Sequence, residues 1–281
     1  MKMMYTNANG QSTWINDEQS YALIHINGLQ PPKAIIQLGS LPLVDGSIFL
    51  QSKIEQRNIV LTLQVLNDFE ANRRRLYDIF KIKQKGTLTI HLSDRTVTIE
   101  AICESIEIVP TTWPLRAMIS LICPQPYFEA EQPVILEMSS IEQSLQFPLS
   151  LSPTGNPMGV LSPATAINAI NSGDIACGFT VRFQCVDPVV NPKLIHVTTG
   201  ENIQLLLTLN PGQIIEITTE LGHKRIEEIQ GSTRINLFHT LKLGSTFFQL
   251  KEKDNILFAT SDLGSSSLLT ELSYRPKISG V

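Results

Sequence analysis

Histidine and carboxylate side chains could provide acid–base chemistry, and one pair in this sequence has a spacing that would allow it. His223 and Glu227 could meet across a turn and share a proton. Lys224 and Arg225 lie between them, which is more typical of an ordinary charged hairpin. The remaining histidines occur singly in expected strands or turns, and we interpret them as surface or core residues: His25, His91, His196 and His239.

The four cysteines could bind a metal or form disulfides, but their spacing favours neither. No C-x-x-C motif occurs among them; they are Cys103, Cys123, Cys177 and Cys185. A free cysteine packs as a small hydrophobic residue. We therefore expect buried, reduced thiols and no metal site.

The sequence lacks the common signatures of nucleotide binding and hydrolysis. It contains no G-x-x-x-x-G-K-S/T loop, no G-x-G-x-x-G after a strand, no G-x-S-x-G turn and no H-E-x-x-H helix. We expect no enzyme, no catalytic residue and no cofactor.

The charge balance gives no reason to expect specific binding to nucleic acid or to a membrane. The net charge is −4 and the pI is near 5.8, whereas such binders usually carry a basic excess. Arg73, Arg74 and Arg75 are consecutive, but three successive helical positions fan over about 200° and cannot form one stripe. We interpret them as solvent or subunit contacts, and a phosphate-facing role is the alternative.

The hydropathy pattern predicts neither a membrane span nor a signal peptide. No stretch approaches the roughly 18 apolar residues of a membrane span, and the first residues lack the apolar core of a signal peptide. We expect the chain to fold in the cytoplasm of the cell that makes it.

A proline-rich segment in the middle of the chain predicts a domain boundary. A chain of 281 residues exceeds what one core usually serves. The strand "ISLIC" runs into two prolines, which lack the amide proton of a sheet ladder. We expect a rigid interdomain strap between domains 1–130 and 131–281, made of Cys123, Pro124, Pro126, Tyr127 and Phe128.

The elements before the strap are mainly β. Residues 86–101 alternate in hydropathy around a turn and predict a β-hairpin, and further strands are expected at 33–38, 47–50, 59–65, 103–109 and 115–122. One helix is expected over 67–83, with Asn67 and Glu70 at capping-box spacing.

The elements after the strap predict an antiparallel β-sandwich or jelly roll. Short β runs alternate with turn sequences such as "NPGQ", "LGHK" and "KEKDN". Residues 131–163 are rich in Ser, Pro and Gly and lack a period, so we expect an ordered wrap or a long connection there.

Several stretches together resemble one protein family along nearly the whole chain. "IHINGLQPPKAII" (24–36), the helix ending "RLYDIF" and "ISLICPQPYF" (119–128) resemble the N-terminal domain of distal tail proteins of long-tailed, non-contractile bacteriophages. "INSGDIACGFTVRF" (170–183), "NPKLIHVTTGENIQL" (191–205) and "ITTELGHKRI" (217–226) resemble their C-terminal domain.

The resemblance implies a structural virion protein located in the phage tail. It implies a homo-hexameric ring that joins the tail tube to the baseplate or tail tip and leaves a channel for DNA. It also implies an N-terminal tail-tube-like β-barrel or sandwich with one helix, and a C-terminal galectin-like antiparallel β-sandwich. The implied partners are the tail tube protein, a tail-associated hub protein and receptor-binding proteins.

Assembly is expected to depend on the first domain. Only 17% of the residues are charged, below the usual quarter, which favours surface covered by partners. Segment 39–53 carries two apolar runs with few charges, an unusual composition for a solvated loop; the alternative is a hairpin folded onto its own domain. The candidate interface residues are Gly28, Leu29, Pro31, Pro32, Leu43 and Phe49.

Two other functions compete with the structural role. The outer sandwich could bind a host glycan, although a scaffold does not carry sugar binding with it and both tryptophans lie in the first half. A cell-wall hydrolase would need a carboxylate or Cys/His constellation that the sequence lacks.

Overall fold

The computed structural model describes residues 1–281 apart from 18, 42–44, 110–112, 144–158 and 163–165. The chain forms two compact units: unit 1 contains Met1–Glu131 and Lys277–Val281, and unit 2 contains Gln132–Pro276. Residues 277–281 were expected in the second domain. The structure places them in unit 1, because β25 (Lys277–Ile278) pairs with β10 (Phe128–Ala130).

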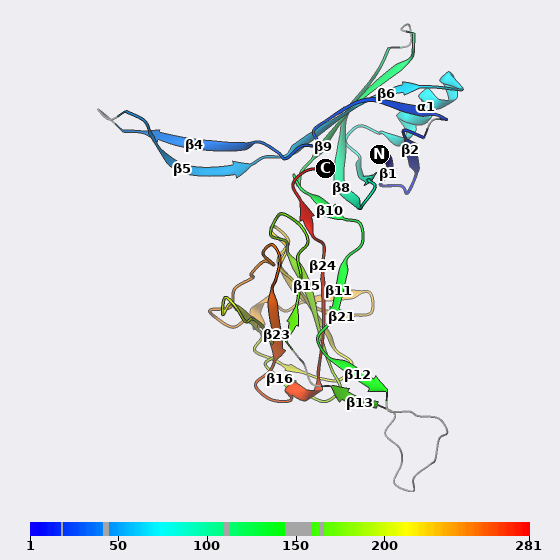
Figure 1. The fold of residues 1–281 in the computed structure, drawn as a ribbon. Coiled ribbons are helices and arrows are strands. Elements are labelled where there is room, and N and C mark those ends of the chain that lie inside the picture. Colours follow the sequence, from blue (N-terminus) through cyan, green and yellow to red (C-terminus); the bar gives the residue numbers. More distant parts are fainter. Residues whose placement is uncertain (18, 42–44, 110–112, 144–158, 163–165) are drawn as a thin grey trace. The chain divides into compact units, whose positions relative to one another are not determined.

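Unit 1 is built on an antiparallel sheet with the strand order β2-β1-β7-β8-β9-β6-β3, which β10 extends by pairing with β8 (Figure 1). Its elements are β1 (Lys2–Asn7), β2 (Ser12–Ile15), β3 (Tyr21–Asn27), β4 (Ala34–Ser40), β5 (Ser47–Ile54), β6 (Arg57–Val65), α1 (Phe69–Ile79), β7 (Lys85–His91), β8 (Thr96–Ile108), β9 (Arg116–Cys123), β10 and β25.

Hydrophobic alternation positions the strands of unit 1 as expected. Leu88 pairs with Ile99 and Ile90 with Val97, and all four side chains are buried, so the hairpin expected over 86–101 is confirmed. β8 is one continuous strand over a stretch in which two separate strands were expected. A register shift near Cys103 lets this long strand pair with both β7 and β9.

The helix α1 is shorter than expected and begins differently. Leu76 and Ile79 are buried on its inner face, as its spacing predicts. Its N-cap is Asp68, in a left-handed conformation and without a side-chain cap bond, so the capping box is wrong. The side chain of Asn67 donates to Gln19 O instead, and Glu70 pairs with Arg73 at 2.8 Å.

β4 and β5 form a hairpin with a register shift between Gln37 and Leu38, which we call the arm. Almost every residue of both strands is exposed, including those on alternate faces. The expected strands are confirmed here. The alternative in which the hairpin folds onto its own domain is wrong for the described residues, because neither face of the arm is covered.

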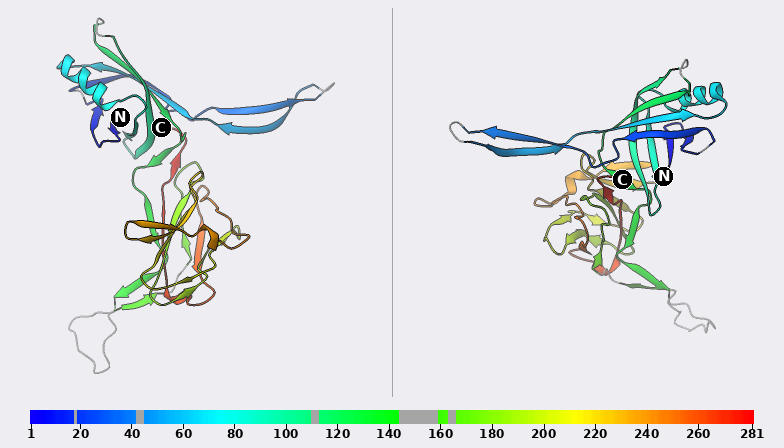
Figure 2. Two further views of the ribbon diagram at one scale, coloured as in Figure 1. Left: turned by 180° about the vertical axis from the view of Figure 1, so that it is seen from behind. Right: turned by 45° about the horizontal axis from the view of Figure 1, so that its top comes forward.

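Unit 2 is a β-sandwich of a six-stranded sheet, β11-β24-β15-β20-β21-β22, and a four-stranded sheet, β14-β23-β17-β18 (Figure 2). Its elements are β11 (Val134–Glu137), β12 (Ser140–Gln143), β13 (Gly159–Ser162), β14 (Ile167–Asn168), β15 (Phe179–Cys185), β16 (Val189–Val190), β17 (Lys193–His196), β18 (Asn202–Gln204), β19 (Thr208–Leu209), β20 (Ile214–Thr218), β21 (Arg225–Gln230), β22 (Thr233–Asn236), η1 (Phe238–Thr240), β23 (Ile256–Thr260), η2 (Ser265–Ser267) and β24 (Leu268–Tyr274).

Inward-facing residues of both sheets form one core in unit 2. Phe183 and Ile217 come from the larger sheet, and Leu194 and Leu257 from the smaller one, and all four are fully buried. The expected sandwich is confirmed. In the expected wrap, β11 joins the larger sheet and β12 pairs with β13, while 144–158 and Pro163 lie outside the described residues.

Unit 2 should fold without unit 1, because its core cluster uses only residues between 134 and 274. A fragment of residues 132–276 is expected to show a β-type circular dichroism spectrum and a cooperative thermal transition. A second fragment, 132–281, should melt at the same temperature, since its last five residues belong to unit 1. A fragment 132–276 without a cooperative transition would contradict this independence.

Candidate interaction surfaces

The arm presents apolar side chains that unit 1 does not cover. Ile36, Leu38, Phe49 and Leu50 are each between 58% and 64% exposed. Figures 1 and 2 show the arm extending away from the sheet of unit 1 in each view. A two-stranded hairpin alone is marginally stable in water, and contiguous exposed apolar surface marks an interaction site. The arm is therefore the clearest surface of unit 1 for binding another protein chain.

The candidate interface residues have different positions in the structure. Phe49 is exposed on the arm, whereas Leu43 lies outside the described residues. The prediction that Leu29 lies at the interface is wrong, because its side chain is buried in the core of unit 1. Pro31 lies so close to Gly280 that a Cβ on that glycine would be 2.6 Å from the proline ring, while Pro32 is half-buried. The segment before the arm thus packs within its own unit.

The backbone conformation and the close packing of unit 1 require a glycine at position 28. Its φ is +91°, and an added Cβ would lie 2.0 Å from Asn58 O. Gly10 has a similar φ of +79° but open space around it. Substitution of Gly10 would therefore add only conformational strain, whereas substitution of Gly28 would add both strain and a steric clash.

Substituting Gly28 by alanine is expected to destabilise unit 1 much more than the same change at Gly10. Gly10→Ala should lower the free energy of unfolding by about 1–2 kcal/mol through left-handed strain alone. Gly28→Ala adds the clash with β6, so its loss should be at least about 2 kcal/mol larger. Urea unfolding followed by tryptophan fluorescence reports unit 1 selectively, because both tryptophans, Trp14 and Trp113, lie there. Equal losses would mean that the close approach is unimportant.

One buried arginine joins the segments around the base of the arm. Arg57 is 4% exposed, and its Nε donates to Pro126 O at 2.7 Å. Its Nη1 donates to Gly28 O at 2.6 Å and to Gln30 O at 2.9 Å, and its Nη2 donates to Ser279 O. In the described part of the chain, Arg57 has no carboxylate at ion-pair distance. Carbonyl oxygens from three distant segments therefore satisfy its charge.

An aromatic ring completes the surroundings of Arg57. The guanidinium lies 4.5 Å from the ring centre of Phe128, a cation–π contact. Burial lowers the pKa of Arg57 below its ordinary value. Arg57 was not predicted as a key residue, although it occupies an inward position of β6 in the same alternation as Ile59 and Leu61. A charged residue in an inward-facing series was the available signal.

The strap lies inside unit 1 and not at its exit. Cys123 is buried and is the last residue of β9, in register with Arg57, so this residue of the strap is part of the sheet. Pro124 and Pro126 follow, Tyr127 is half-buried, and Phe128 begins β10, which pairs with β8 and β25. The strap therefore connects two strands of one unit, and the chain leaves unit 1 only after Glu131.

The cysteines are free and buried, as expected. Burial raises the pKa of the Cys103 thiol to about 11 and that of Cys123 to about 12. At neutral pH both remain protonated, and only a thiolate is a good nucleophile or metal ligand. Among the described residues, no group of three or more His, Cys, Asp or Glu side chains could hold a metal ion.

A row of charged side chains crosses the outer face of the larger sheet of unit 2, and we call it the charged row. Arg182 Nε donates to Glu216 Oε2 at 2.9 Å, and Arg182 Nη1 lies 3.4 Å from Glu271 Oε1. Arg234 Nη1 donates to Glu216 Oε1 at 2.8 Å and to Glu227 Oε2 at 2.9 Å. The row also includes Glu137, opposite Glu271 in register.

Glu216 is the buried centre of the charged row. Burial alone would raise its pKa, but the hydrogen bonds from Arg234 and Arg182 outweigh it and lower the pKa below its ordinary value. Glu227 belongs to this network, and the described residues include no bond between it and His223. The structure therefore does not bring the pair considered in the sequence together as a catalytic site.

The comparisons with known proteins agree with this architecture. Residues 172–277 match the family model of the siphovirus-type tail component, C-terminal domain. Over this segment the chain is similar to the siphovirus-type tail components. No curated protein matches the chain. The family match spans most of unit 2 and less than half of the chain.

Solved structures extend the similarity to the whole chain. The crystal structure of SPP1 Dit (gp 19.1), described as a paradigm of the hub adsorption apparatus in phages infecting Gram-positive bacteria, is 12% identical with a TM-score of 0.70, covering 98% of each chain. A chain of the phage P2 baseplate in its activated conformation with Ca is 11% identical with a TM-score of 0.53, covering 100% of this chain and 99% of that one. The form with Sr gives 11%, 0.52 and the same coverage.

At these identities the structural similarity shows the fold. Together with the family match it supports a distal tail protein of siphophages, a structural component of the phage tail. The mainly β architecture with one α-helix among the described residues is confirmed. In the part of the chain that the structure describes, no helix is both long and apolar enough to cross a membrane.

Proposed function

We propose that this siphovirus-type tail component assembles into a homo-hexameric ring that joins the tail tube to the baseplate or tail tip. The ring leaves a central channel through which DNA passes. Its other partners are the tail tube protein, a tail-associated hub protein and receptor-binding proteins.

The arm is the observation that carries this proposal. Its apolar side chains have no cover within unit 1, and its two strands have unpaired outer edges. Such surface is unfavourable in a free monomer. A neighbouring copy that accepts the arm leaves its own arm free for the next copy, and repetition of this head-to-tail contact closes a ring.

The similar solved structures add support from their own descriptions. One is described as part of a hub adsorption apparatus and two as phage baseplates. A structural hub needs rigid packing more than it needs reactive side chains. The buried, protonated cysteines and the carbonyl-bound Arg57 fit that requirement.

Electron microscopy and light scattering of the purified full-length protein test this function. Negative-stain images are expected to show rings, and the mass in light scattering should be six times that of the chain, whose mass is 31.2 kDa. A protein that remains monomeric at all concentrations, in the absence and presence of the tail tube protein, would overturn the proposal.

A further inference from the structure

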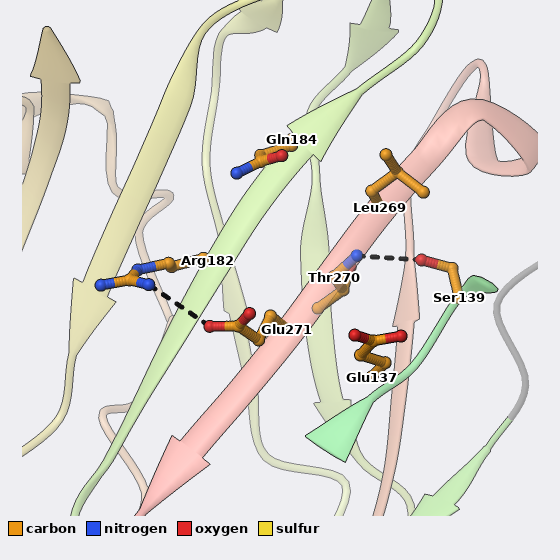
Figure 3. A pocket seen from close by; sticks show the side chains of 7 residues that line it. All are labelled: Glu137, Ser139, Arg182, Gln184, Leu269, Thr270 and Glu271. Carbon is orange, nitrogen blue, oxygen red and sulfur yellow. Dashed lines mark hydrogen bonds and ion pairs between the residues drawn. The ribbon is translucent and has the colours of Figure 1, made fainter. Parts of the chain in front are cut away.

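The outer face of the larger sheet in unit 2 contains two neighbouring hollows, one on each side of the Arg182–Glu271 pair. The first has a volume of about 310 Å³ and is lined by Glu137, Ser139, Gln184 and Leu269 in addition to that pair (Figure 3). The second has a volume of about 390 Å³, and its lining adds Ile135, Thr180, Glu216, Arg234 and Ser273. Each volume is within the range of small-molecule sites.

The first hollow contains polar atoms that the described protein does not use. Arg182 donates through Nε and Nη1, which leaves Nη2 available. Glu271 accepts through Oε1 only, and no described group bonds the carboxylate of Glu137 or the amide of Gln184. Figure 3 shows these side chains on three adjacent strands around the hollow. Donors and acceptors therefore lie side by side in one hollow.

This mixture restricts the chemistry of a ligand. A cation only donates hydrogen bonds and would leave the guanidinium and the amide N–H groups unmatched. An anion only accepts them and would be repelled, because four carboxylates of the charged row face two guanidiniums. A hydroxyl group both donates and accepts, so adjacent hydroxyls can use the carboxylates, the amide and the guanidinium together.

The hollows also offer aliphatic surface. Leu269 lines the first hollow, and Ile135, which is 57% exposed, lines the second. The C–H face of a sugar ring can pack on such a side chain while its hydroxyls bond the polar atoms. The ion pairs around Glu216 hold Arg182 in place, so a ligand would meet donors that are already positioned.

We propose that the two hollows form a binding site for a neutral saccharide of at least two sugar rings, with one ring in each hollow and the Arg182–Glu271 pair between them. Glu137 and Gln184 bind the ring in the first hollow through its hydroxyls. None of the residues that line the two hollows belongs to the arm.

Calorimetric titration of the full-length protein with defined probes tests the site. The neutral probes are maltose, lactose, cellobiose and chitobiose at millimolar concentrations, and the charged probes are tetralysine and a hyaluronan disaccharide. At least one neutral disaccharide is expected to bind. Glu137→Ala and Gln184→Ala should each weaken that binding by about tenfold, the usual effect of losing a hydrogen bond of this kind. Glu252→Ala, an exposed carboxylate of unit 2 outside both hollows, should not change it.

Each variant should keep the melting temperature of the parent protein, because neither Glu137 nor Gln184 has a described side-chain bond to lose. The proposal is overturned if no neutral disaccharide binds, or if Glu137→Ala and Gln184→Ala leave binding unchanged. Binding of tetralysine alone would identify a site for a basic protein segment, and binding of the hyaluronan disaccharide alone would identify an anion site; both results would also overturn it.

Discussion

Replacing Leu38 and Phe49 by aspartate is expected to convert the proposed ring into monomers without unfolding unit 1. The two residues face each other in register on β4 and β5, and they are 59% and 64% exposed. Because neither side chain packs in the core, the charges do not disturb the fold of the unit. At a subunit interface, however, two buried and unpaired carboxylates cost several kcal/mol per contact. That loss is repeated at every contact of a closed ring.

Light scattering measures the loss of assembly, and circular dichroism checks that the β content is unchanged. The matched control is Ser52→Asp, which adds a charge to the same hairpin without removing apolar surface. It should weaken assembly much less than the double substitution. Rings that survive both aspartates would exclude the arm from the interface. Unfolding of the double variant would show that these side chains support the core.

Arg57→Ala is expected to destabilise unit 1 by about 3 kcal/mol or more, because partly buried carbonyl oxygens from three segments lose their donor. Arg57→Lys should recover only part of this loss, since one ammonium group cannot reach acceptors spread around a planar guanidinium. Tryptophan fluorescence in urea measures the stability of unit 1.

Hydrogen exchange locates the effect of Arg57. The amide of Val281 donates to Leu29 O at 3.0 Å, and this bond depends on the tail staying beside the segment before the arm. Its exchange should accelerate in Arg57→Ala. Arg116→Ala removes an exposed arginine from the neighbouring strand and should change neither stability nor exchange appreciably. Equal effects of the two substitutions would contradict a specific role of Arg57.

Local patterns predicted most strands, because a half-buried strand must alternate its side chains. The pairing of Leu88 with Ile99 and the sandwich of unit 2 followed from that rule. Hydropathy could not separate a hairpin that packs on its own unit from one that does not. Phe49 is exposed because the arm extends away from the sheet of unit 1, and the segment that contains Gly28 and Leu29 sets that direction.

The failures have a common physical origin in contacts between distant segments. Asn67 and Glu70 fit a capping box by spacing, but Gln19 and Arg73 compete for their side chains. Arg57 bonds carbonyls 69 and 222 residues away, and no local pattern contains that information. The charged row likewise combines residues from separate strands, so it became visible only with the sheet register.

The pairing of β25 with β10 affects the order in which the two units can be completed during translation. Residues 277–281 supply one acceptor of Arg57 and the last strand of unit 1, and they are synthesised after all of unit 2. Unit 1 therefore begins its sheet with the first residues that are synthesised and completes it with the last ones. A chain released before residue 277 would contain all the strands of unit 2 but would lack the last strand of unit 1. Completion of unit 1 is therefore delayed until all of unit 2 has been synthesised.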